Sequence, residues 1–306
     1  MKHFVFKLLG TERCTRLAQG LGDLSSKAAR YVERNSPGPG FSNVPIERNA
    51  DFKTAYDRLV FLRLGHTGSW SFWDSISQCT PTRNRVSIDW KPEDLNAALD
   101  HINSLSETDK NNIQLIGLHC AYPVHTHFSG TTKYVTLLRD PVKTAVSKYF
   151  WQYNHRHDLS ADWVCSEIRD GMSLSAWVEN IMPDSIYARW ILRLNNKEIG
   201  DFQNRTEDIL TECMVIINDM FLMVGITERF DESLYMFSCL SGQHAVPLWR
   251  HLGQSNAPRI EDLNPAILKR IEEKTDIDRQ LFALCKDRFM PPGMVDCGGY
   301  TGTKSG

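Results

Sequence analysis

The chain has 306 residues, 42% of them hydrophobic and 24% charged, so it can bury a sizeable core and is neither a disordered segment nor a small disulfide scaffold. Lys and Arg number 35 and Asp and Glu 37, and this near-neutral balance gives no reason to expect nucleic-acid binding. No stretch reaches the roughly 18 apolar residues that a membrane span needs, and the apolar run near the N-terminus is too short for a signal peptide. The 8 cysteines form no CxxC pair and are typical of buried thiols in a reducing compartment, so we expect a cytoplasmic protein.

A serine followed by alternating prolines and glycines occupies 36–40, a cluster that predicts a loop. This cluster follows a segment of helical character at 11–34. We therefore expect an N-terminal helical extension and linker over 1–50, one folded domain over 51–290, and a flexible tail over 291–306, where glycine is frequent.

Strands and helices alternate along the central domain. Apolar runs predict strands at 58–64, 85–88, 114–119, 133–138 and 221–226. Periodic segments predict helices at 70–76, 91–105, 142–153, 229–241, 264–289 and over most of 160–220. This alternation predicts an α/β fold with a parallel central sheet flanked by helices. Ligands of such sheets bind at the carboxyl ends of the strands, so the segments that follow the strands are the candidate site.

A loop of small residues, 65–69, follows the first strand and precedes a helix. Small residues let backbone N–H groups approach an anion, and a helix N-terminus adds partial positive charge. Ser69 is expected to cap the helix. The loop lacks the GxxxxGK[ST] order of a standard nucleotide triphosphatase. A capped tight turn without a ligand is the alternative.

Two other strands end in residues suited to an anion site. His119 follows the strand at 114–119 and is a candidate general base near neutral pH; a hydrogen-bonded core histidine is the alternative. Arg139 ends the strand at 133–138, where a guanidinium can bind a phosphate in bidentate fashion. Ser147 follows two helical turns later. A structural cap formed by Arg139 and Asp140 is the alternative here.

The loop at 65–69, then His119, then Arg139 with Ser147 follow one another along the chain. This succession resembles the sulfotransferase superfamily, in particular the branch of carbohydrate sulfotransferases related to heparan sulfate 2-O-sulfotransferase. Residues 63–72 resemble the 5′-phosphosulfate loop of that family, and residues 139–149 resemble its 3′-phosphate segment. The stretches 224–234 and 275–282 are similar to the same branch. The resemblance thus covers approximately residues 56–290.

The resemblance implies a P-loop nucleotide-kinase-like sheet, the sulfotransferase fold, over 51–290. It implies transfer of a sulfuryl group from 3′-phosphoadenosine 5′-phosphosulfate (PAPS) to a hydroxyl of a carbohydrate or glycolipid, with release of 3′-phosphoadenosine 5′-phosphate (PAP) and without a metal. His119 would be the base, and Arg139 and Ser147 would bind the 3′-phosphate. The 5′-phosphosulfate would be bound by the loop residues Gly65, His66, Thr67, Gly68, Ser69, Trp70 and Ser71.

The chain departs from the family at His66, where the family loop usually has a lysine that stabilises the bridging oxygen of the donor. We expect the anionic oxygens of a bound donor to protonate His66, which would then take the role of that lysine. Two other functions are compatible with the sequence: a non-catalytic nucleotide-binding protein of the same fold that has lost the loop lysine, and an ATP-dependent small-molecule kinase, which the missing Gly-Lys pair disfavours. The acceptor and the oligomeric state are left open.

Overall fold

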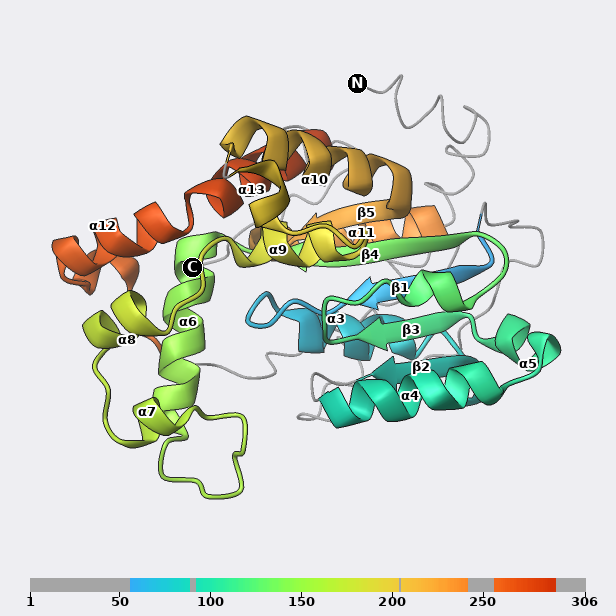
Figure 1. Ribbon diagram of the computed structural model, residues 1–306, viewed down its shortest axis with the longest axis horizontal. Coiled ribbons are helices and arrows are strands. Elements are labelled where there is room, and N and C mark those ends of the chain that lie inside the picture. Colours follow the sequence, from blue (N-terminus) through green and yellow to red (C-terminus); the bar gives the residue numbers. More distant parts are fainter. Residues whose placement is uncertain (1–55, 89–91, 204, 242–255, 290–306) are drawn as a thin grey trace, which may run out of the picture.

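The computed structural model describes residues 56–88, 92–203, 205–241 and 256–289 (Figure 1). The expected N-terminal helix and linker, and the expected tail over 291–306, lie outside these residues.

Five strands form one parallel sheet in the order β2-β3-β1-β4-β5 (Figure 1). They are β1 (Arg58–Leu62), β2 (Arg85–Ile88), β3 (Leu115–Leu118), β4 (Thr132–Leu138) and β5 (Phe221–Ile226). The predicted α/β class with a parallel central sheet is confirmed. The arrangement is P-loop-like, since β1 lies in the middle of the sheet and leads through the small-residue loop into a helix.

Helices connect the strands and flank the sheet. The α-helices are α3 (Ser69–Ser77), α4 (Pro92–Ser104), α5 (Glu107–Asn112), α6 (Pro141–Asn154), α7 (Ser166–Arg169), α8 (Leu174–Asn180), α9 (Ile186–Arg193), α10 (Thr206–Met220), α11 (Phe230–Ser241), α12 (Pro265–Lys274) and α13 (Asp276–Phe289). Short 3₁₀ turns are η1 (Thr82–Asn84), η2 (Val124–His127), η3 (Ile199–Phe202), η4 (Thr227–Arg229) and η5 (Ile260–Asp262). None of the helices described is long and apolar enough to span a membrane.

The segment expected as one helix over 264–289 is two helices, α12 and α13. The Thr275 side chain ends the first, because its hydroxyl donates to the carbonyl of Ile271 at 2.7 Å and the residue leaves helical geometry. The sequence pattern also missed α5, a six-residue helix that Ser106 caps by accepting a hydrogen bond from the Asp109 amide.

Right-handed crossovers place helices on both faces of the sheet. The chain passes from β1 to β2 through α3 and returns to β3 through α4, so these two helices lie on opposite faces. Helix α3 packs with α11, where the rings of Phe72 and Phe237 meet edge to face with their centroids 5.8 Å apart. Helices α9, α10 and α13 pack together over β4 and β5 (Figure 1).

The Trp73 side chain of α3 packs directly over Gly117 of β3. A Cβ atom at Gly117 would lie 2.8 Å from the ring of Trp73, so no larger residue fits without a shift. The Trp73 ring stacks on Phe61 of β1, with an interplanar angle of 7°. The start of α3 is thereby fixed at the carboxyl end of the sheet.

A second apolar cluster lies beyond the carboxyl ends of the strands, toward which the arrowheads in Figure 1 point. Helices α6, α7, α8 and α12 build it, and Tyr149, Trp177 and Ile271 are among its buried residues. This helical group faces the loops that leave β1, β3 and β4.

Candidate functional site

The loop between β1 and α3 turns sharply at two left-handed residues, His66 (φ 64°) and Gly68 (φ 74°). Gly68 is the N-cap of α3 and, as a glycine, makes no side-chain cap hydrogen bond. The expectation that Ser69 caps it is wrong: Gly68 ends the loop one residue earlier, so Ser69 is already helical. A helix start without a side-chain cap leaves amide donors for solvent or for an anion.

Hydrogen bonds hold this loop from both ends. The Thr67 hydroxyl donates to the carbonyl of Leu64 at 2.8 Å. The Thr227 hydroxyl lies 2.5 Å from the carbonyl oxygen of Thr67 and 3.0 Å from that of Leu138. The stretch 224–234, which the sequence singled out, therefore supports the loop.

Ser233 packs against Gly225 and thereby holds the stretch 224–234 in place. Ser233 accepts a hydrogen bond from the amide of Ile226 at 2.8 Å, and a Cβ atom at Gly225 would lie 2.9 Å from the Cβ atom of Ser233. The close approach fixes the turn after β5, from which Thr227 reaches the loop.

The side chains of Arg139 and Asp140, at the end of β4, have different partners. The Asp140 carboxylate caps α6 by accepting from the amide of Lys143 at 3.0 Å, and Pro141 occupies the first helical turn as expected. The Arg139 guanidinium instead donates to the carbonyl of His66 at 3.1 Å. The arginine thus belongs to the loop and not to the helix cap.

Four basic side chains converge at the loop. The pKa of His66 is lowered to about 3, mainly by burial and then by the charges of Lys148, Arg139 and His119, in that order. These neighbours come from α6 and from the ends of β4 and β3, so His119, Arg139 and His66 are brought together as the sequence predicted. In this state the imidazole is neutral, because three basic neighbours and burial oppose the imidazolium that we expected with a donor bound.

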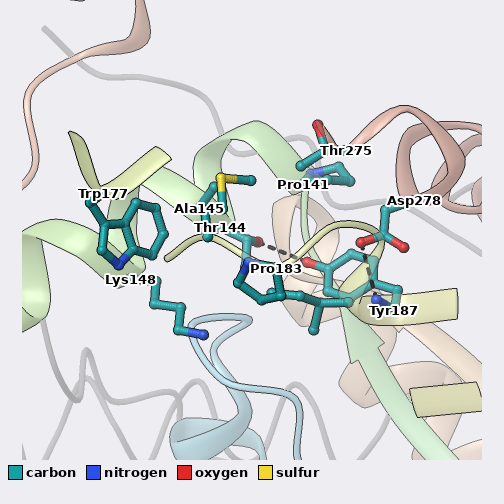
Figure 2. A pocket seen from close by; sticks show the side chains of 11 residues that line it. Pro141, Thr144, Ala145, Lys148, Trp177, Pro183, Tyr187, Thr275 and Asp278 are labelled. Atoms are coloured by element: carbon teal, nitrogen blue, oxygen red, sulfur yellow. Dashed lines mark hydrogen bonds between the residues drawn. The ribbon is translucent and has the colours of Figure 1, made fainter. Parts of the chain in front are cut away.

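Lys148 is the member of this cluster that the sequence analysis did not identify. It directly follows Ser147. Its position inside the segment 139–149, which resembles the 3′-phosphate segment of the family, is the sequence feature that could have identified it. Figure 2 shows its ammonium directed away from the pocket wall toward the loop between β1 and α3. Ser147 itself is buried, with 6% of its surface exposed, and does not line that pocket.

The pocket beside Lys148 lies between α6, α8, α9 and α13 (Figure 2). The hydroxyls of Thr144 and Tyr187 are 2.8 Å apart, and the Tyr187 hydroxyl donates to the carbonyl of Arg139 at 3.0 Å. Burial raises the pKa of Asp278 to about 7. This carboxyl group accepts from the amides of Tyr187 and Ala188 at 3.1 and 3.0 Å, so the stretch 275–282 holds the start of α9 in place.

The remaining loop residues differ in exposure. Ser69 and Ser71 are buried, whereas 58% of the Trp70 side chain is exposed. The Arg63 guanidinium lies 4.5 Å from the Trp70 ring centroid and holds this ring at the rim of the site.

Histidine pairs with metal-like spacing have other partners in the fold. The His125 ring is 2.9 Å from the Tyr134 hydroxyl, and the His127 ring lies between Tyr122 and Asn103. In the described ranges, no group of three or more His, Cys, Asp and Glu side chains is placed to hold a metal ion.

No family model matches the sequence. No curated protein matches it either. Among solved structures, the chain is similar to mouse sulfotransferase SULT7A1 complexed with PAP, with 15% sequence identity, 75% of this chain and 90% of that chain covered, and a TM-score of 0.34. A likeness of this size assigns no activity to the chain, and the fold class rests on the sheet topology described above.

Proposed function

We propose that this protein is a sulfotransferase that moves a sulfuryl group from PAPS to a hydroxyl of a carbohydrate or glycolipid acceptor. The observation that carries the proposal is the convergence of Lys148, Arg139 and His119 on the loop at 65–69. Basic groups held together with partial loss of solvent repel one another, and a bound polyanion relieves this repulsion. The four sequence segments that resemble sulfotransferases suggest that this polyanion is PAPS.

The chemistry asked of these residues is charge stabilisation and one proton transfer. The acceptor oxygen attacks sulfur, the bond between sulfur and the bridging oxygen breaks, and its electron pair stays on the 5′-phosphate of PAP. The acceptor proton goes to His119, which follows β3 beside the loop. Arg139 and the amides at the start of α3 bind the donor, and this positioning supplies much of the rate enhancement in such reactions.

A non-catalytic nucleotide-binding protein is the second candidate, because His66 is neutral and the loop itself supplies no permanent charge. An ATP-dependent kinase remains disfavoured by the missing Gly-Lys pair. The cytoplasmic location and the domain limits at 51 and 290 stay predictions.

Calorimetry with PAP and AMP tests the donor, and an acceptor screen with labelled PAPS tests turnover. We expect PAP to bind the wild-type protein more tightly than AMP, and Arg139→Ala to weaken PAP by about 10- to 100-fold, the worth of a charge-assisted hydrogen bond. Equal affinity of the wild type for PAP and AMP contradicts the proposal. Binding of PAP without turnover on any acceptor class supports the non-catalytic candidate.

A further inference from the structure

The ammonium of Lys148 has an unusual setting on α6. Its side chain is partly buried, lines the pocket with Thr144 and Tyr187, and extends toward the loop between β1 and α3 (Figure 2). It forms no hydrogen bond or ion pair with any residue in the described ranges. Cys165 is the titratable neighbour that favours its charged form.

A lysine held in this way lowers the stability of the fold. Burial lowers the pKa of Lys148, and the charge of Lys148 in turn lowers the pKa of His66 in the loop. Uncompensated basic groups in a partly desolvated site cluster where anions are bound. A structural role would be better served by an apolar residue, since the neighbouring lining includes Trp177, Pro183 and Ile186.

We propose that Lys148 binds the 5′-phosphosulfate end of the donor and supplies, from α6, the positive charge that the loop lacks at His66. This inference rests on the proposed function. The cation at the 5′ side would then be the Lys148 ammonium on α6, and the loop would carry a neutral imidazole. In the transfer step, the lysine would stabilise the negative charge that develops on the bridging oxygen as the sulfur–oxygen bond breaks.

Two nucleotides that differ only in the 5′-phosphate, PAP and adenosine 3′-monophosphate, test this assignment by calorimetry without any acceptor. Lys148→Met keeps the length of the side chain and removes the charge. We expect it to weaken PAP about 10- to 100-fold and to change the affinity for adenosine 3′-monophosphate less than about twofold. Lys143→Met is the matched control, since Lys143 is exposed on the first turn of the same helix, and it should bind both nucleotides like the wild type.

The double variant His66→Lys, Lys148→Met places the cation back in the loop. We expect it to recover most of the PAP affinity that Lys148→Met loses, and thermal unfolding of each variant shows that it is folded. Unchanged PAP affinity in Lys148→Met, or an equal loss for both nucleotides, overturns the role of Lys148 even where the wild type prefers PAP to AMP. If the wild type does not distinguish PAP from AMP, the proposed function fails first, and the inference with it.

Discussion

The hydroxyl of Thr227, in the turn after β5, lies 2.5 Å from the carbonyl oxygen of Thr67, 160 residues earlier in the chain. The same hydroxyl lies 3.0 Å from the carbonyl of Leu138, next to Arg139. One side chain therefore ties the loop at 65–69 to the end of β4 and sets the distance between the two halves of the proposed donor site.

Thr227→Val should loosen this connection while keeping the shape of the side chain. We expect a loss of about 1 kcal/mol in the free energy of unfolding, because a partly buried hydrogen bond is removed, and a several-fold loss of PAP affinity. Urea unfolding and calorimetry measure the two effects. Thr126→Val is the control, since its exposed hydroxyl donates only to the neighbouring Pro123 carbonyl, at 2.8 Å. PAP affinity equal to that of the wild type in Thr227→Val contradicts a supporting role.

His119→Asn should remove most turnover while leaving nucleotide affinity nearly intact. Asparagine is of similar size but cannot accept the acceptor proton, and general-base assistance is worth roughly 10²- to 10⁴-fold. Steady-state rates with an acceptor found in the screen, together with the PAP affinity, measure this. His101→Asn on the exposed side of α4 is the control. A His119→Asn variant with the wild-type rate places the base elsewhere.

The neutral state of His66 predicts how stability depends on pH. Its pKa is about 3 in the folded protein and about 6.5 in an unfolded chain, so the unfolded state binds the extra proton between these values. The fold should therefore lose stability as the pH falls from 6.5 toward 4. Asparagine tolerates the left-handed backbone at this position, so His66→Asn should lose less stability over the same range.

Urea unfolding of wild type and His66→Asn at several pH values between 4 and 7.5 gives this difference directly. Lys148→Met should raise the pKa of His66, because the charge that most strongly opposes its protonation is gone. Parallel pH curves for wild type and His66→Asn would show that the imidazole is protonated equally in both states.

The titration of Asp278 predicts a pH dependence of stability with the opposite sign, between about pH 4 and pH 7. Its pKa is about 7 in the fold and near 3.8 in an unfolded chain, so the folded state holds a proton that the unfolded state has lost. This group's contribution to stability falls as the pH rises from about 4 to 7. Asp278→Asn should remove that slope and cost about 1–3 kcal/mol, since an amide offers the start of α9 a single acceptor oxygen.

Asp276→Asn is the matched control for Asp278, because Asp276 is exposed on the first turn of the same helix. Chemical unfolding at pH 5 and pH 7.5 separates the two variants. A slope in Asp278→Asn that equals the wild-type slope would show that this carboxyl group does not carry the extra proton.

Much of the local structure follows from the sequence alone. Strands β2 and β5 have the predicted limits, and the start of α6 at Pro141 was expected, because apolar runs and a proline in the first turn act over a few residues. The cap of α3 was misassigned because a left-handed glycine and a serine are both acceptable at that point, and the backbone dihedral decides between them.

The sequence by itself determined the α/β class and which segments follow the strands, since parallel strands bring their carboxyl ends to one edge of the sheet. It could therefore place His119, Arg139 and the loop at 65–69 at one site. Only the tertiary structure decided that Lys148 and Thr227 join them, because the direction of a side chain on a helix or turn depends on how that element packs against the rest. It also decided the charge of His66, because the pKa of an imidazole is set by burial and by basic neighbours that come from distant parts of the chain.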